Sequence, residues 1–123
     1  QIWDMINALA ARDGRQGLAK IDELGQLDPK IEDAAVGAVT VWLLQVLKAR
    51  ELVDRRLGDG QIISELRLWP QDRAQNVLRM ARGWGLKGAA RWSDALLRVD
   101  LRNKTSVGTP RSNLEKFIVA LCA

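Results

Sequence analysis

The sequence predicts an all-α protein, and three observations support this fold class. Apolar residues recur three and four positions apart along almost the whole chain of 123 residues. No run of alternating β-branched residues is long enough to predict a strand. Gly, Pro and Asp residues interrupt the pattern where helices commonly begin or end. We expect residues 1–123 to form one domain, a single compact bundle of about six or seven helices with one long central helix.

The first two helices are predicted from residues 2–25. Residues 2–12 carry apolar side chains on one face, namely Ile2, Met5, Ile6 and Leu9. Asp13 is placed to cap the second helix, which is expected to end near Gly25. The apolar positions of this second helix are Leu18, Ile21 and Leu24.

A long third helix is predicted to start at Pro29, as a first-turn residue, with Asp28 as its cap. Its apolar stripe runs to about Leu57 and comprises Ile31, Ala35, Ala38, Trp42, Val46, Ala49 and Val53. The sequence Gly58-Asp59-Gly60 is expected to end it. At about 1.5 Å per residue the helix would be roughly 40 Å long, enough for the spine of a bundle.

Residues 61–82 predict a short helix, a connection containing Trp69-Pro70, and a second helix from about Gln71. The inward positions of the second helix are Ala74, Val77, Leu78 and Ala81. Together with Arg73, Arg79 and Arg82, this pair resembles a helix-turn-helix outline, although plain bundles contain such pairs too. A helical nucleic-acid-binding module is therefore the alternative function.

Two more helices are predicted after the glycines of 83–88, which lack the context of a phosphate-binding loop. The sixth spans about 89–103, with Trp92, Leu96, Leu97 and Val99 at its apolar face. Thr109 is expected to cap the seventh, with Pro110 at its first position and Ser112 and Glu115 as a second capping choice. The seventh helix carries four apolar residues that either fill the core or face a neighbouring subunit: Leu114, Phe117, Ile118 and Leu121.

The composition argues against an enzyme. There is no histidine, and the only cysteine is Cys122, so the chain offers neither the commonest general base nor a metal-ligand set, and no cofactor is expected. A single cysteine permits no intrachain disulfide, which favours the cytoplasm. No apolar run reaches the ~18 residues of a membrane span.

The charges are unevenly distributed along the chain. Residues 1–40 contain 4 Lys and Arg against 7 Asp and Glu, whereas residues 41–123 contain 15 Lys and Arg against 8 Asp and Glu. The basic later part is compatible with a nucleic acid nearby.

Asp100 and Lys104 lie four residues apart near the end of the sixth predicted helix. An exposed pair of this kind contributes only about 0.3–0.5 kcal/mol, and no nucleophile and base are arranged around it. The wider pattern, LLRVDLRNKTSVGTP at 96–110 followed by LEKFIVAL at 114–121, resembles the C-terminal collar domain of the delta subunit of bacterial DNA polymerase III, the clamp-loader protein. Other matching segments follow in the same order: IWDMINALA, GLAKIDEL, VLKA and the short helix before Trp69-Pro70.

The resemblance implies a role in DNA replication as an assembly scaffold. In that family the collar joins delta to the gamma or tau subunits and to delta prime, in the ring that loads the sliding clamp on primed DNA. Delta does not hydrolyse ATP, and its N-terminal AAA+-like domains contact the clamp. The chain starts at Gln1 within an amphipathic pattern and without an initiator methionine, so we expect a domain excised from a longer chain that carries those domains.

Two features depart from the family pattern, namely Gly37 inside the long helix and five tryptophans. Trp69 and Trp84 both stand beside predicted turns, so they are candidates for stacking on template DNA bases, with core filling as the alternative.

Overall fold

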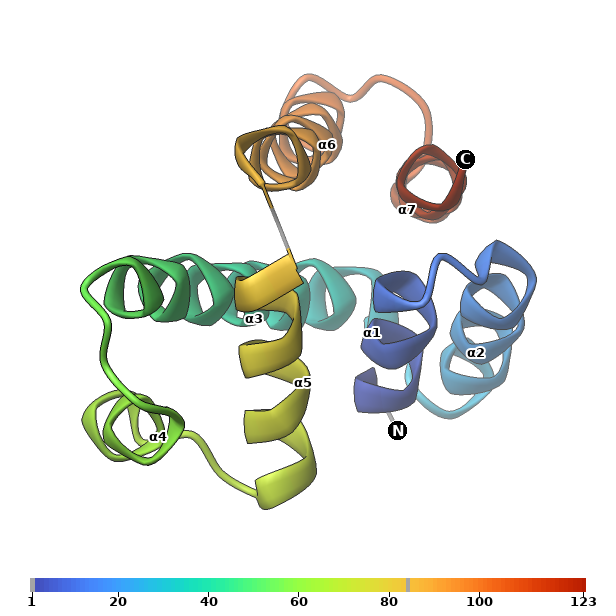
Figure 1. The fold of residues 1–123 in the computed structure, drawn as a ribbon. Helices are drawn as coiled ribbons and strands as arrows, with labels where there is room; N and C mark the ends of the chain where they lie inside the picture. The colour runs from blue at the N-terminus through green and yellow to red at the C-terminus, as the bar shows by residue number, and fades with distance from the viewer. Residues whose placement is uncertain (1, 84) are drawn as a thin grey trace. The chain divides into compact units, whose positions relative to one another are not determined.

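The structure of the chain is a computed structural model that describes residues 2–83 and 85–123, and over these residues it contains seven helices and no strand. This confirms the predicted all-α class and the number of helices. The helices are α1 (Ile2–Ala10), α2 (Gly14–Leu27), α3 (Ile31–Asp54), α4 (Asp59–Leu66), α5 (Gln71–Gly83), α6 (Leu86–Lys104) and α7 (Pro110–Cys122) (Figure 1). The longest is α3, with 24 residues, as the apolar stripe predicts.

The chain divides into two compact units. Unit 1 consists of Gln1–Thr40 and Ala90–Ala123, and unit 2 consists of Val41–Ala89. Unit 1 therefore contains α1, α2, α7, the first part of α3 and most of α6, while unit 2 contains the rest of α3 together with α4 and α5.

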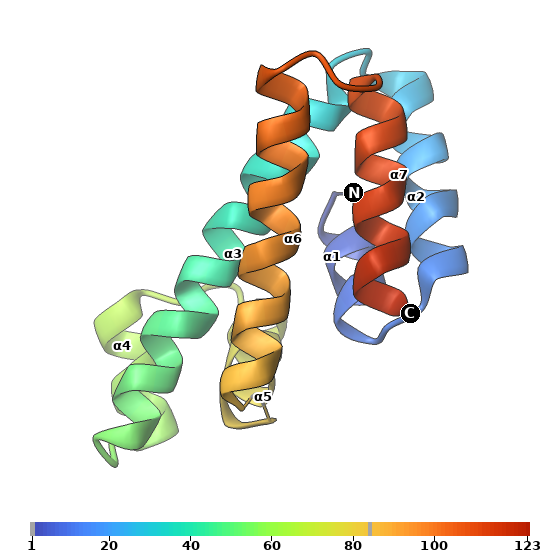
Figure 2. The ribbon, with the colours of Figure 1, turned by 90° about the horizontal axis from the view of Figure 1, so that it is seen from above.

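In unit 1, α1, α2 and α7 pack against one another around a shared apolar core (Figure 2). The core is built from the predicted faces of these helices, with Met5, Ile6, Leu9, Ile21, Leu114, Phe117, Ile118 and Leu121 buried. Gly17 of α2 is buried between α1 and α7. A Cβ atom there would lie 3.2 Å from side-chain atoms of both Leu9 and Ile118, so the small residue permits the close approach.

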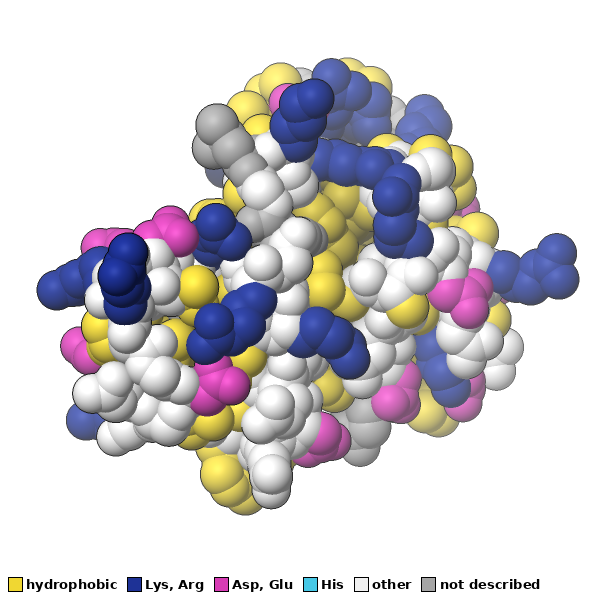
Figure 3. All heavy atoms as spheres, viewed as in Figure 1, with side chains coloured by type: hydrophobic (Ala, Val, Ile, Leu, Met, Phe, Trp, Pro, Cys, Tyr) yellow, Lys and Arg dark blue, Asp and Glu magenta, His cyan; other side chains and the backbone are white. Residues whose placement is uncertain are grey.

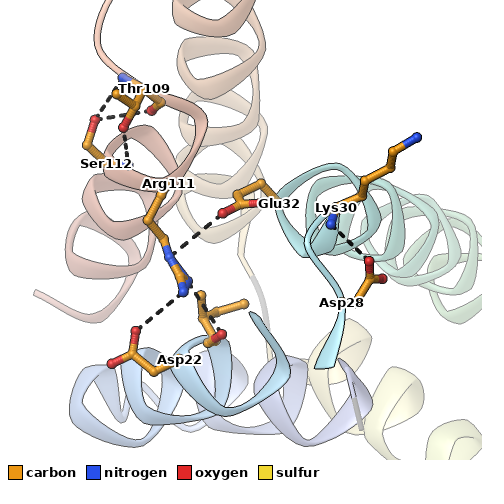
Figure 4. Close-up of polar contacts among 8 residues, drawn as sticks. Asp22, Asp28, Lys30, Glu32, Thr109, Arg111 and Ser112 are labelled. Carbon is orange, nitrogen blue, oxygen red and sulfur yellow. Dashed lines mark hydrogen bonds and ion pairs between the residues drawn. The ribbon is translucent and has the colours of Figure 1, made fainter. Parts of the chain in front are cut away.

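Arg111, in the first turn of α7, connects three helices of unit 1 (Figure 4). Its guanidinium lies 3.5 Å from a carboxylate oxygen of Asp22 on α2 and 3.8 Å from one of Glu32 on α3, and it donates to the carbonyl of Ile21 at 3.4 Å. The group is half-buried, so water screens these interactions only in part. At the other end of α7, Arg12 and Arg91 donate to its last carbonyls and so satisfy groups that a helix leaves unpaired.

In unit 2, α4 and α5 lie on the same side of α3 (Figure 1). The predicted inward residues Ala74, Val77, Leu78 and Ala81 of α5 are all buried. Trp42 of α3 is also buried, and its indole Nε1–H donates to Oδ1 of the buried Asn76 at 2.6 Å. Arg50 of α3 donates to the carbonyl of Ala81 at 3.1 Å, and Arg82 of α5 pairs with Asp59 of α4. Polar contacts thus join all three helices of this unit.

Four helices end at a residue other than glycine in the left-handed conformation, which the sequence did not predict. These residues are Arg12, Arg56, Arg67 and Ser106, with φ between 53° and 64°. After each, the next N–H reaches back five residues, as in Leu57 N–H to Leu52 C=O at 3.1 Å. This is the Schellman motif, in which the left-handed residue is usually glycine.

Several predicted boundaries are therefore wrong. The glycine at 58 does not end the third helix but precedes α4, and its N–H donates to the side chain of Gln61 at 3.0 Å. The second helix continues past Gly25 to Leu27, and Asp28 is its C-cap, with its N–H donating to the carbonyl of Leu24. The third helix, α3, starts at Ile31 rather than at Pro29. The side chain of Asp28 accepts from the N–H of Lys30 at 2.9 Å, which holds a turn between the helices (Figure 4).

Candidate protein-docking surface

The orientation of α6 is set by its contacts inside unit 1. Trp92 and Val99 are buried, and the indole of Trp92 packs edge-to-face on Phe117 of α7, with ring centroids 6.4 Å apart and planes at 85°. At about 100° per residue, the side opposite these two residues must face outward.

The outward side of α6 carries Leu97, Asp100, Leu101 and Lys104, which we call the α6 outer face. Leu97 is 63% exposed and Leu101 is 57% exposed. The prediction that Leu97 belongs to the buried face is therefore wrong. The residue lies two positions from Val99, which places it about 160° away around the helix. The helix thus presents two large apolar side chains to solvent beside a charged pair.

Asp100 and Lys104 are in contact, as their spacing predicts. The Lys104 Nζ lies 2.9 Å from the Asp100 Oδ2 atom, and a second pair on the same helix joins Arg98 to Asp94 at 3.2 Å. All four side chains are at least half exposed, so each pair adds only about 0.3–0.5 kcal/mol to stability. Their larger effect is to border the exposed leucines with charge of both signs, a composition typical of an interface rim.

The corner between α6 and α7 is held by a buried side-chain amide. Asn113 is 1% exposed, and its Nδ2 donates to Oδ1 of Asn103 at 2.9 Å and to the carbonyl of Val107 at 2.8 Å. Gly108 has a φ of 69°, and a Cβ atom there would lie 2.7 Å from Oδ1 of Asn113. The loop therefore needs glycine both for its backbone conformation and for the space.

The start of α7 follows the prediction. Thr109 is the N-cap: its side chain accepts from the N–H of Ser112 at 3.1 Å, while the Ser112 hydroxyl accepts from the N–H of Thr109 at 3.0 Å (Figure 4). The capping pair is therefore Thr109 with Ser112, and the alternative with Glu115 is not the one formed.

The four apolar residues of α7 are core residues. Leu114, Phe117, Ile118 and Leu121 are each at most 3% exposed. Side chains buried to this extent inside unit 1 have no surface to offer a neighbour, so they are not the candidate subunit interface that the sequence suggested. The exposed leucines of α6 are the better candidates, although the helical pattern assigned one of them to the core.

The predicted pair of helices in residues 61–82 is present as α4 and α5. Trp69, in the connection between them, is 82% exposed, which is what a base-stacking role requires. Trp84, the second candidate for DNA contact, lies outside the described residues.

The Asp, Glu and Cys residues in the part of the chain that the structure describes form no group of three or more that could hold a metal ion. Burial raises the pKa of the Cys122 thiol, and the nearby Asp13 carboxylate raises it further, against smaller opposing effects of Arg12 and Arg91. A thiol that ionises with difficulty is a poor nucleophile.

The comparisons with known proteins do not identify the chain: no family model matches it, and no curated protein matches it. Among the helices described here, none combines the length and the apolar character needed to cross a bilayer.

Proposed function

We propose that this chain is a protein-docking scaffold of the clamp-loader type, the helical collar domain of a delta subunit. The observation that carries the proposal is the α6 outer face, where two large apolar side chains stand in solvent within the segment that resembles the family's closing motif. The proposed partners are the gamma or tau subunits and delta prime, and the proposed setting is DNA replication in the cytoplasm. The sliding clamp would be reached only through domains outside this chain.

The energetics favour docking over a purely structural role for the outer face. The ion pair of Asp100 and Lys104 adds little to folding, and exposed Leu97 and Leu101 add little as well. Full burial of a leucine side chain contributes about 1.5–3 kcal/mol, so covering the exposed part of both would contribute about 2–4 kcal/mol to binding. The charged pair at the border would fix register between subunits more than affinity.

The α6 outer face alone is smaller than a complete interface. A stable interface buries about 800 Å² on each partner, which requires roughly 20 residues. We therefore expect the two leucines to be the centre of a larger contact that includes neighbouring turns of α6. In a ring of unlike subunits, a stiff helical corner such as the one around Asn113 would hold this surface at a constant angle.

The test is assembly with partner collars. The chain is mixed with collar domains of gamma or tau and delta prime, and the mass of the complex is measured by light scattering after gel filtration. The double variant Leu97→Glu and Leu101→Glu should weaken assembly at least tenfold, because it places charge in the interface centre. Leu27→Glu is the matched control, since Leu27 is exposed on α2 and outside this face.

Two results would count against the proposal, and they are distinguishable. If the unaltered chain forms no complex with these partners, the assignment as a clamp-loader collar is wrong. If the complex forms and the double variant assembles as well as the control, the scaffold role stands but the α6 outer face is not its docking surface. Circular dichroism of each variant checks that the helices remain intact.

A further inference from the structure

Four exposed side chains along α6 follow the spacing of a seam between two paired helices. Asp94, Leu97, Leu101 and Lys104 are separated by three, four and three residues, the alternation found where helices pack along their length. Asp94 is 60% exposed, Lys104 is 73% exposed, and more than half of each leucine is exposed. At about 100° per residue, all four lie within about 40° of the direction opposite the buried Val99. They form one continuous row on the outer side of the helix.

The order of this row is symmetric about Val99, except that the charge changes sign. Asp94 precedes Val99 by the same number of residues by which Lys104 follows it, and Leu97 and Leu101 are also equally distant from it. A second copy of α6 laid antiparallel, centred on the same level, would therefore place aspartate opposite lysine at both ends and leucine opposite leucine between them. A parallel copy would instead place each charge beside its own counterpart, so the charges select the antiparallel arrangement.

The other charges of this part of α6 are already paired within the helix. Arg98 and Asp100 lie at the sides of the row, about 80° from its middle. Arg98 pairs with Asp94 at 3.2 Å, and Asp100 pairs with Lys104 at 2.9 Å, so neither is an unpaired charge at the border. On the face shown in Figure 3, hydrophobic, basic and acidic side chains stand close together over α6, at the top of the view. A mixed surface of this kind suits a partner with the same mixture.

We propose that the α6 outer face pairs with a second copy of this chain, in an antiparallel two-fold dimer whose centre is formed by Leu97 and Leu101 of both copies. The same patch of each subunit forms both sides of such an interface. This inference rests on the proposed role of the face as a docking surface and names a further partner for it. Because the leucines cannot be covered twice, the dimer and the assembly with other collars exclude each other. The dimer covers the exposed leucines when those partners are absent.

The contact is small, so the dimer is weak. A stable interface buries about 800 Å² on each partner, and one row of four side chains supplies less. The leucines contribute most of the affinity, whereas the charges at the two ends fix the orientation. A dissociation constant of about 10–100 µM is expected, so the dimer forms in concentrated solution and gives way to a tighter partner.

Sedimentation equilibrium of the whole chain at low salt, from about 1 µM to about 1 mM, covers the expected constant. Asp94→Lys should weaken self-association about tenfold, because like charges then face each other at both ends, and Lys104→Asp should do the same. An equal mixture of these two variants should dimerise about as well as the unaltered chain, since opposite charges meet again. Lys116→Asp is the matched control: it makes the same change of charge at an exposed position of α7 and should leave self-association unchanged.

The proposal is overturned if the unaltered chain stays monomeric up to about 1 mM, or if the mixture of variants self-associates no better than each variant alone. It is also overturned if the double variant Leu97→Glu and Leu101→Glu dimerises as well as the unaltered chain. Circular dichroism checks that the helices of each variant are intact.

Addition of gamma or tau and delta prime collars separates this inference from the proposed function. These partners should dissociate the dimer, because they would cover the same leucines. A chain that stays monomeric but assembles with the collars would lose the dimer and keep the docking function. A chain that dimerises through α6 but assembles with none of them would keep the dimer and lose the clamp-loader assignment.

Discussion

The buried hydrogen bond between Trp42 and Asn76 has a contribution to stability that can be measured directly. The indole Nε1 lies 2.6 Å from the amide Oδ1, and the two residues are 1% and 4% exposed. The bond joins α3 to α5 in the core of unit 2. Because both groups are removed from water, leaving either one without a partner costs more than the bond itself contributes.

The perturbation is a double-mutant cycle with Trp42→Phe and Asn76→Leu. Asn76→Leu keeps the size of the side chain but leaves the buried indole N–H without this acceptor, which should cost about 1–3 kcal/mol. Trp42→Phe removes the donor and about one ring of volume, and a similar loss is expected. In the double variant neither polar group is left behind, so it should be about 1–2 kcal/mol more stable than the sum of the single changes predicts.

Urea unfolding followed by circular dichroism is the appropriate assay, because tryptophan fluorescence changes with the substitution itself. The free energy of unfolding of all four proteins is obtained by linear extrapolation. If the two units unfold in separate transitions, the coupling should appear in the transition of unit 2 alone. Single changes that add within about 0.5 kcal/mol would refute the reasoning, since they would show that the two groups do not depend on each other.

Backbone geometry and burial lead to three further predictions. Arg56→Gly should raise the free energy of unfolding by about 1 kcal/mol, because Arg56 has a φ of 64°, a conformation that glycine adopts without steric cost. Arg56→Ala should give no such gain, since alanine keeps the Cβ atom. Equal urea midpoints for the two variants would contradict this prediction. Gly37→Ala should stabilise α3 by about 0.5–1 kcal/mol, since nothing lies within 4 Å of the added Cβ. Gly17→Leu should instead lower the stability of the protein by about 2 kcal/mol or more in thermal melts, because a Cβ at this position already lies 3.2 Å from Leu9 and Ile118. A tolerated Gly17→Leu would contradict the close approach of α1, α2 and α7. The Cys122 thiol should react with iodoacetamide more slowly than the thiol of an unstructured cysteine peptide at the same pH, because only the thiolate reacts and burial raises the pKa of Cys122. The reaction rate of Cys122 should also keep rising at pH values where the rate of the peptide has levelled off. Equal rates for the protein and the peptide would contradict the burial of this thiol.

The helices could be predicted from the sequence because their apolar faces are continuous. Each predicted helix exists, and the predicted inward residues of α5 and α7 are all buried. The ends of helices were predicted less well, for a physical reason. Glycine is the residue most expected at a left-handed cap, but here that conformation falls on Arg12, Arg56, Arg67 and Ser106. Tertiary packing and the return hydrogen bonds outweigh a local cost that residue preference alone would avoid.

The candidate docking surface was predictable only in part. The spacing of Asp100 and Lys104 predicts their contact, and the structure has it at 2.9 Å. The exposure of Leu97 was not predictable, because a leucine at helical spacing is more often buried than not. The contacts of Arg111 with Asp22 and Glu32 join residues about 80–90 positions apart, and no local pattern in a single sequence indicates such pairs.

The α6 outer face combines two kinds of contact that respond differently to salt. Burial of Leu97 and Leu101 is apolar and depends weakly on ionic strength, whereas the exposed pair of Asp100 and Lys104 is screened within about one Debye length. Raising the ionic strength should therefore slow association with other subunits while leaving the assembled complex largely intact. If salt dissociated the complex, charged contacts rather than the leucines of α6 would hold it together.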